Sequence, residues 1–130
     1  MDFSQLKALA LSKVNPRRLS NHCHVASVAC ALETDTGNIY TGVCIDTACG
    51  MGFCAEHAAI AQMITKEESH IVRIVAVSTS GQIYPPCGRC REFMFQVDPK
   101  NLAAEIMISE EKIVELEELL PYRWEEKSSP

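Results

Sequence analysis

Three cysteines and one glutamate, set in two short motifs, constrain this chain more than any other feature. Cys54 precedes Glu56 by two residues. Cys87 follows directly after Pro86, and two residues separate Cys87 from Cys90. Three thiolates fill three corners of a tetrahedral zinc ion and leave the fourth for water, whereas a structural zinc site takes a fourth protein ligand. A carboxylate beside the first ligand is placed to move the protons of that water. The spacing therefore predicts one zinc per chain in an open, catalytic site, with Glu56 as proton shuttle.

The other cysteines and the histidines lack such spacing. A Cys-x-x-Cys pair alone also occurs in redox motifs and zinc ribbons, and it is Cys54 and Glu56 upstream that favour a catalytic metal site. The remaining cysteines are expected to be small buried residues: Cys23, Cys30, Cys44 and Cys49. The histidines, His57 among them, are expected to be packed or to lie on the surface.

Composition limits the classes of partner. The 130 residues predict a single domain, residues 1–130, and 47% apolar residues suffice for its core. A formal net charge of −5 argues against a nucleic-acid surface, since such surfaces are basic, and favours a small-molecule substrate. No apolar run approaches the roughly 20 residues that cross a bilayer, so no membrane span is expected.

The cysteine content indicates a reducing compartment. Seven cysteines cannot all pair within one chain, and three of them already have metal spacing. The segment from Met1 to Asn15 carries Asp2 where a secretion signal would be positively charged. We therefore expect a cytoplasmic protein.

Apolar periodicity predicts helices and strands in alternation. Helices are expected over Phe3–Val14, Cys54–Lys66, Cys90–Val97 and Glu110–Leu120, the last with Ser109 as N-cap and Pro121 as its end. Strands are expected over Val25–Leu32, Asn38–Ile45, Ile71–Ser78 and Leu102–Ile108, the first two forming a hairpin with its turn at Thr34–Gly37. The tail after Glu125 is expected to fray. This order predicts a three-layer α/β/α domain with a mixed sheet.

The predicted ligands stand at the starts of two helices. Free backbone N–H groups and the positive ends of the helix dipoles would therefore stabilise the thiolates. Zinc with three thiolates still carries a net charge of 2 − 3 = −1, so further donors to the sulfurs are expected. Arg89 and Arg91, just inside the second of these helices, are the candidates.

The chain resembles the cytidine deaminase family, and within it the short cytidine deaminases and blasticidin S deaminase, from about Val25 to Trp124. The two metal motifs match the zinc deaminase signature. The resemblance also rests on Val25-Ala26-Ser27, Ile39-Tyr40-Thr41-Gly42-Val43, the run from Cys87 to Arg91, and Glu118-Leu119-Leu120-Pro121. Val-Ala-Ser and Cys-Gly-Arg-Cys-Arg are closer to the blasticidin type.

The resemblance implies roles for particular residues. Cys54, Cys87 and Cys90 would bind zinc, and Glu56 would shuttle protons. Backbone groups near Ala55, Pro85 and Cys87 would surround the pyrimidine ring. The family also implies a homotetramer with active sites at subunit junctions, where Trp124 would stack on a neighbouring subunit's ligand.

Three positions depart from the family pattern. Cys44 and Asp46 stand where cytidine deaminases have the Asn and Glu that hold ribose, and a thiol cannot supply an amide's paired donor and acceptor. His57 stands where an Arg often braces the thiolates, which shifts that role toward Arg91. Retained chemistry with altered sugar recognition is expected.

These observations predict a zinc-dependent hydrolytic deaminase of a free cytosine-type nucleoside or related small heterocycle. The alternative within enzymes is a blasticidin S deaminase-type detoxification enzyme. A nucleic-acid editing deaminase module is disfavoured by the acidic charge. A non-catalytic protein stabilised by zinc is the remaining alternative.

Overall fold

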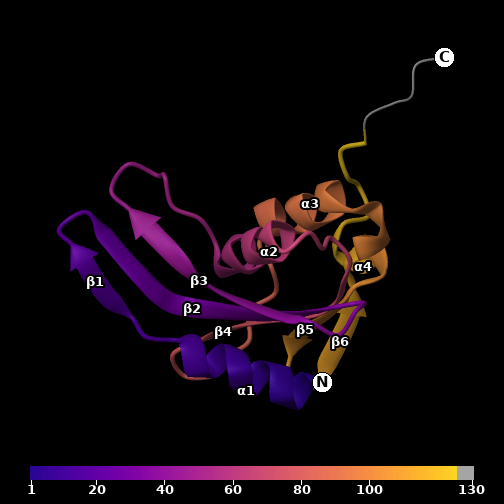
Figure 1. Cartoon of the computed structure of the whole chain (residues 1–130), viewed down its shortest axis with the longest axis horizontal. Coiled ribbons are helices and arrows are strands. Elements are labelled where there is room, and N and C mark those ends of the chain that lie inside the picture. The colour runs from indigo at the N-terminus through magenta and orange to yellow at the C-terminus, as the bar shows by residue number, and fades with distance from the viewer. Residues whose placement is uncertain (126–130) are drawn as a thin grey trace.

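The computed structural model describes residues 1–125, which form a six-stranded sheet covered by helices on both faces (Figure 1). The helices are α1 (Phe3–Lys13), α2 (Ala55–Thr65), α3 (Gly88–Val97) and α4 (Leu116–Leu119), with a 3-10 helix at Pro99–Ala103. The strands are β1 (Arg17–Ser20), β2 (Cys23–Thr34), β3 (Ile39–Thr47), β4 (Ile71–Ser78), β5 (Glu105–Ser109) and β6 (Lys112–Glu115).

Strand β2 organises the sheet. It pairs antiparallel with β3, with β4 along residues 28–34, and with β1 along residues 23–25. Strands β4 and β5 are parallel, and β6 returns antiparallel to β5. The mixed sheet expected from the sequence is therefore confirmed.

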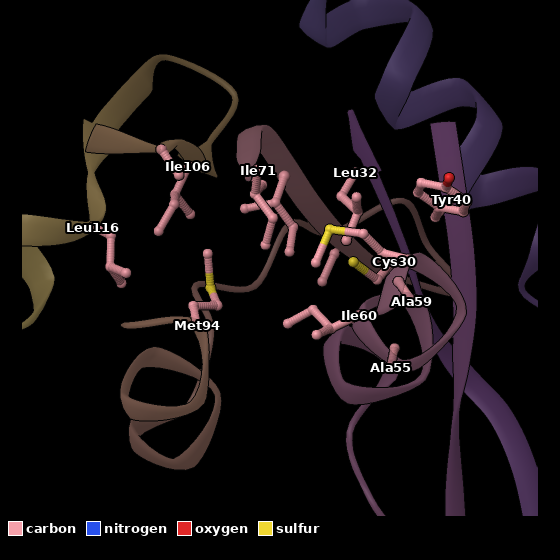
Figure 2. Close-up of a cluster of buried hydrophobic side chains, with 14 of the residues drawn as sticks. Cys30, Leu32, Tyr40, Ala55, Ala59, Ile60, Ile71, Met94, Ile106 and Leu116 are labelled. Atoms are coloured by element: carbon pink, nitrogen blue, oxygen red, sulfur yellow. The ribbon is translucent and has the colours of Figure 1, made fainter. Parts of the chain in front are cut away.

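Side chains alternate across the sheet and build two cores. On β4, Ile74 and Ala76 belong to the cluster beneath α2 and α3, whereas Val75 and Val77 belong to the cluster that α1 covers. Figure 2 shows the first cluster, where Met94 of α3 and Ile60 of α2 point toward the sheet. Burial on both faces explains the near-continuous apolar sequence of β4 and confirms the three-layer arrangement.

Most elements lie where the sequence predicts them. Helix α1 buries Leu6 and Ala10 of its apolar stripe and begins with a capping box between Asp2 and Gln5. The hairpin turn is closed by the Gly37 N–H, which donates to the Thr34 carbonyl at 2.9 Å. The hairpin strands are longer than predicted, since β2 and β3 reach Cys23–Thr34 and Ile39–Thr47.

The predicted helix over Glu110–Leu120 is wrong. This segment forms strand β6 and only then the single turn of α4. The Ser109 hydroxyl accepts the Glu111 N–H at 3.4 Å and thus closes a turn, not a helix start. Val114 is buried opposite Ile106 of β5, and this pairing outweighs the helix propensity of the surrounding glutamates and leucines.

Two boundaries also differ from the prediction, and one strand was not predicted. Strand β5 begins at Glu105, not Leu102, because the Asp98 side chain caps a 3-10 helix by accepting the Lys100 N–H at 3.0 Å. Helix α3 begins at Gly88, two residues earlier than expected. Strand β1 was not predicted, since its four residues are exposed and show no apolar alternation.

Two further expectations concern the ends and the surface of the fold. The predicted fraying after Glu125 falls on residues outside the described range. Within residues 1–125 we find no helix with the length and apolar character needed to cross a membrane.

A close approach at Gly42 fixes α2 against β3. A Cβ atom at this position would lie 2.3 Å from the Ala59 nitrogen and 2.6 Å from the Ala58 Cβ. Only glycine allows the helix to lie this near the strand. Since α2 begins directly after Cys54, Gly42 also sets the position of the first cysteine motif.

We predict that Gly42→Ala lowers the free energy of unfolding by about 1–3 kcal/mol, because the added methyl group overpacks the contact with α2. Urea denaturation measures this loss. Gly88→Ala is the matched control: a methyl group there meets no atom within 4 Å, so stability should be unchanged or raised by about 0.4–1 kcal/mol. Equal stability of the two variants would contradict the proposed contact.

Candidate active site

Helices α2 and α3 begin next to one another, and each begins at a cysteine. Cys54 is the N-cap of α2 and Cys87 the N-cap of α3, both with extended backbone. Their Sγ atoms lie 3.5 Å apart, and the Cys87 Sγ lies 3.5 Å from that of Cys90 in the first turn of α3. The structure thus brings together two motifs that are 33 residues apart in the chain.

These sulfurs fit a zinc ion. Tetrahedral zinc with Zn–S bonds near 2.3 Å places its sulfurs about 3.8 Å apart, close to the observed separations. All seven cysteines are free thiols, so no disulfide competes for the three. The donor set is soft and suits zinc better than magnesium or calcium.

A histidine also reaches the sulfurs. The His57 Nδ1 lies 3.3 Å from the Cys90 Sγ, and the ligand atoms of Cys54, His57 and Cys90 all lie within 4.8 Å of one another. Cys87 is not part of that set. Two sets of three donors therefore share Cys54 and Cys90, and they differ in whether Cys87 or His57 is the third. In the sequence, His57 stood out only as the replacement for an arginine that often braces the thiolates, and it was not expected to be a ligand.

The pKa values of the three thiols are shifted in different directions. Burial raises the pKa of Cys90 well above its usual range, and the negative charge of Glu56 adds to this shift. Burial also raises the pKa of Cys54. For Cys87, burial acts in the same direction but is outweighed, chiefly by the Cys90 backbone N–H and sulfur hydrogen bonds, so its pKa is lowered. A bound cation would offset the cost of holding thiolates at the buried Cys90 and the half-buried Cys54.

Glu56 lies in the first turn of α2 and is only 6% exposed. Burial raises the pKa of its carboxyl group, and its own backbone N–H partly offsets the shift. A buried carboxyl with a raised pKa holds and releases protons closer to neutral pH than an exposed one.

A cavity of about 490 Å³ opens in front of this cluster. Cys54, Glu56 and Cys87 line it. Its wall also includes residues that the sequence predicted for substrate binding or for the surroundings of the metal, namely Ala55, Pro85, Cys44, Asp46 and Arg89. Ser27 lines it too, although the sequence marked this residue only as part of the Val-Ala-Ser resemblance, and so do Phe53 and Tyr84, which no sequence pattern singled out.

An irregularity in β2 shapes one wall of the cavity. Ala26 has a φ of 66°, and the pairing register with β3 shifts between Val25 and Ala29. Beyond it, the Val28 N–H donates to the Cys44 Sγ at 3.3 Å, and the Ser27 hydroxyl lies 3.3 Å from the same sulfur. The Cys44 sulfur is therefore held by β2 at the edge of the cavity.

The other residues predicted near the site are spread more widely. Arg89 lies on the cavity wall. Burial of the His57 imidazole lowers the pKa of His57, and the positive charge of Arg89 lowers it further. Arg91 donates from Nε to the Pro86 carbonyl at 2.8 Å and from a terminal nitrogen to the Leu119 carbonyl at 3.2 Å. It thus anchors the loop before Cys87.

Trp124 lies apart from the cavity. Its side chain is 63% exposed, and its backbone N–H donates to the Glu92 carboxylate at 3.0 Å. Within residues 1–125 it is not among the residues that line the cavity. Contact of Trp124 with a ligand would therefore require a neighbouring subunit.

Comparison with known proteins places this site in a family. The family model for the cytidine and deoxycytidylate deaminase zinc-binding region matches residues 4–106. Cytidine deaminase of Halalkalibacterium halodurans is 31% identical over 75 residues, which cover 57% of this chain and 57% of that protein. Blasticidin-S deaminase of Bacillus cereus is 28% identical over 129 residues, 92% of this chain and 90% of the relative.

The fold agrees with these matches. The crystal structure of cytidine deaminase from Mycobacterium leprae superposes with a TM-score of 0.78 at 24% sequence identity, covering 94% of this chain and 99% of that one. The matched region contains both cysteine motifs, with α2 and α3 starting at the shared sulfur cluster. This chain therefore belongs to the cytidine and deoxycytidylate deaminase family and carries its zinc-binding region.

Proposed function

We propose that the chain, as a single domain, catalyses hydrolytic deamination of a free cytosine-type nucleoside or a related small heterocycle. Cys54, Cys87 and Cys90 would hold one zinc ion, and Glu56 would transfer protons. The observation that carries this proposal is the buried Glu56 carboxyl, which lines the same cavity as the sulfurs of Cys54 and Cys87.

In the proposed reaction, Glu56 carries out the proton transfers. Water adds to the amine-bearing ring carbon, a C–O bond forms, the C–N bond breaks, and ammonia leaves. Glu56 takes a proton from the attacking water and delivers protons to the ring nitrogen and to the departing amine. Zinc, when bound, supplies the acidity that makes water a nucleophile at neutral pH. Ala55 and Pro85 would contact the ring through backbone groups at the cavity wall.

Cys87 is favoured over His57 as the third ligand. Cys87 lines the cavity with Cys54, and its pKa is lowered, so its thiolate forms most readily among the three. Its position at the N-cap of α3 also places it at the positive end of that helix.

The cavity supports a small-molecule substrate. A volume of about 490 Å³ suits a nucleoside-sized ligand. Cys44 and Asp46 would contact the substituent on the ring nitrogen, since both line the cavity. The net charge of −5 disfavours a nucleic-acid editing role.

A blasticidin S deaminase-type detoxification enzyme is the second candidate. The Bacillus cereus blasticidin-S deaminase aligns along nearly the whole chain, whereas the Halalkalibacterium cytidine deaminase aligns over about half. Cys44 and Asp46 favour the same candidate, because they replace the residues expected to hold ribose. A purely structural zinc protein would leave the buried Glu56 carboxyl unexplained.

Features of the same site support proposals for the cellular location of the protein and for its oligomeric state. Three thiols that bind zinc must stay reduced, so we place the protein in the cytoplasm. We further propose a homotetramer. Large apolar side chains are exposed close to the cavity, among them Met51, Phe53 and Tyr84, and a neighbouring subunit would cover them.

The zinc assignment predicts about one zinc per chain in protein purified without chelators, measured by elemental analysis. The triple variant Cys54→Ser, Cys87→Ser, Cys90→Ser should lose the metal. The matched control is Cys49→Ser. The Cys49 thiol lies outside the site and is exposed, contrary to the burial expected from the sequence, so this variant should keep the metal. Full zinc occupancy in the triple variant would refute these ligands.

Glu56→Gln should keep zinc and fold but lose at least about 100-fold in turnover, because the amide cannot accept a proton. Ammonia release from a panel of nucleosides and bases measures the loss. Glu111→Gln, in the exposed turn between β5 and β6, serves as the control and should retain full activity. If Glu56→Gln lost only a few-fold, Glu56 would be removed from the mechanism.

Cytidine should be a weak substrate, because Cys44 and Asp46 do not replace the usual ribose contacts. An unpaired hydroxyl costs about 1–3 kcal/mol, or roughly 5- to 150-fold in specificity. Steady-state comparison of cytidine, deoxycytidine, cytosine and blasticidin S tests this. The double variant Cys44→Asn, Asp46→Glu should gain cytidine efficiency within that range. A parent protein that strongly prefers cytidine would show that another residue holds the sugar.

Light scattering should give four times the chain mass for the zinc-loaded protein. The site would then draw on neighbouring subunits, and Trp124→Ala should reduce activity without displacing zinc. A stable monomer with full activity would exclude the shared-site arrangement.

A further inference from the structure

We propose that His57 is not a zinc ligand but donates its Nδ1–H to the Cys90 thiolate from behind the metal site, with Phe93 holding the ring in place. The inference rests on the proposed function, in which Cys54, Cys87 and Cys90 bind the metal.

The geometry fits a hydrogen bond. The His57 Nδ1 lies 3.3 Å from the Cys90 Sγ, and the imidazole stacks on the Phe93 ring with parallel planes and a centroid separation of 4.3 Å. His57 belongs to α2, whereas Cys90 and Phe93 lie one turn apart on α3. The stack therefore fixes the imidazole across the junction of the two helices, with one ring nitrogen facing the sulfur.

The cavity lies on the side of Cys54 and Cys87, and His57 lies on the side of Cys90. Cys54, Glu56 and Cys87 line it, but in the part of the chain that the structure describes neither His57 nor Cys90 does. His57 shares this position with Cys90, so its Nδ1 reaches the Cys90 sulfur at 3.3 Å without occupying the cavity. The ligand atoms of one zinc lie within about 4 Å of each other. Cys87 does not join the set formed by Cys54, His57 and Cys90, so one ion would not use all four.

The negative charge of the proposed metal site requires a hydrogen-bond donor such as His57. Three thiolates on a divalent ion leave a net charge of −1, and Cys90 is the most deeply buried of the three sulfur-bearing residues. A buried thiolate needs a hydrogen-bond donor, and donors next to metal ligands orient and stabilise them. Arg91, the residue expected to brace the sulfurs, instead donates to the carbonyls of Pro86 and Leu119. His57 occupies the position that this role requires.

The first test uses the unmodified zinc-loaded protein. X-ray absorption at the zinc edge should show three sulfur neighbours and one light atom without the outer-shell scattering of an imidazole. Proton–nitrogen correlation spectra of the histidines should show the Nδ1–H tautomer for His57. Imidazole scattering at the zinc would overturn the proposal.

The second test compares two variants. His57→Asn places an amide nitrogen near the position of Nδ1 and keeps a donor, whereas His57→Ala removes it. Zinc affinity, measured by competition with a chromophoric chelator, should fall about 10–100-fold in His57→Ala and recover largely in His57→Asn. Unchanged affinity in His57→Ala, or equal losses in both folded variants, would overturn the proposal.

Neither readout depends on turnover. If the imidazole is absent from the zinc shell and asparagine restores affinity, the role of His57 stands even when no tested substrate releases ammonia. Conversely, a turnover-competent protein with imidazole bound to zinc would refute only the role of His57. The two failures are therefore distinguishable, and circular dichroism of both variants verifies that they remain folded.

Discussion

Two helix N-termini meet at one point of this fold, and the proposed site is organised around that meeting. Cys54 and Cys87 each stand at an N-cap, so their sulfurs lie where free backbone N–H groups and helix dipoles favour negative charge. This arrangement offsets part of the cost of gathering three thiolates within hydrogen-bonding distance. It also leaves Glu56, one residue inside α2, next to the same cluster. The proposed chemistry is thus located where the two helices start and not along either of them.

Packing around the sheet holds this meeting point in place. The absence of a side chain at Gly42 lets α2 lie directly on β3, and the cluster in Figure 2 packs α2 and α3 against the same sheet face. The buried Asn101 side chain joins the end of α3 to the start of β4, because it bonds the Met94 carbonyl and the Ile71 N–H. The two helices are therefore fixed to one rigid layer, which a site with tight sulfur spacing requires.

Much of the fold could be predicted from local pattern, and the failures have a common cause. Helix α1, the hairpin turn, α2 and β4 follow from periodicity and turn residues that act over a few positions. The residues of strand β6 favour a helix, and only the pairing of Val114 with Ile106 of β5 reverses that preference. Strand β1 left no pattern, since its exposed residues gain from pairing with β2 alone. In both cases a partner distant in sequence decided the structure.

The proposed chemistry can be predicted from the amino-acid sequence, because the spacing of Cys54, Glu56, Cys87 and Cys90 indicates an open zinc site. The surroundings of this site depend on how the chain packs. His57 meets Cys90 because two helices pack side by side, and Ser27 reaches the cavity because β2 is irregular at Ala26. The proposed metal ligands fall in two short motifs, and the residue types and spacing within each motif can be recognised in the sequence although 33 residues separate Cys54 from Cys87. The surroundings of the site depend on contacts between distant segments, which no short motif contains.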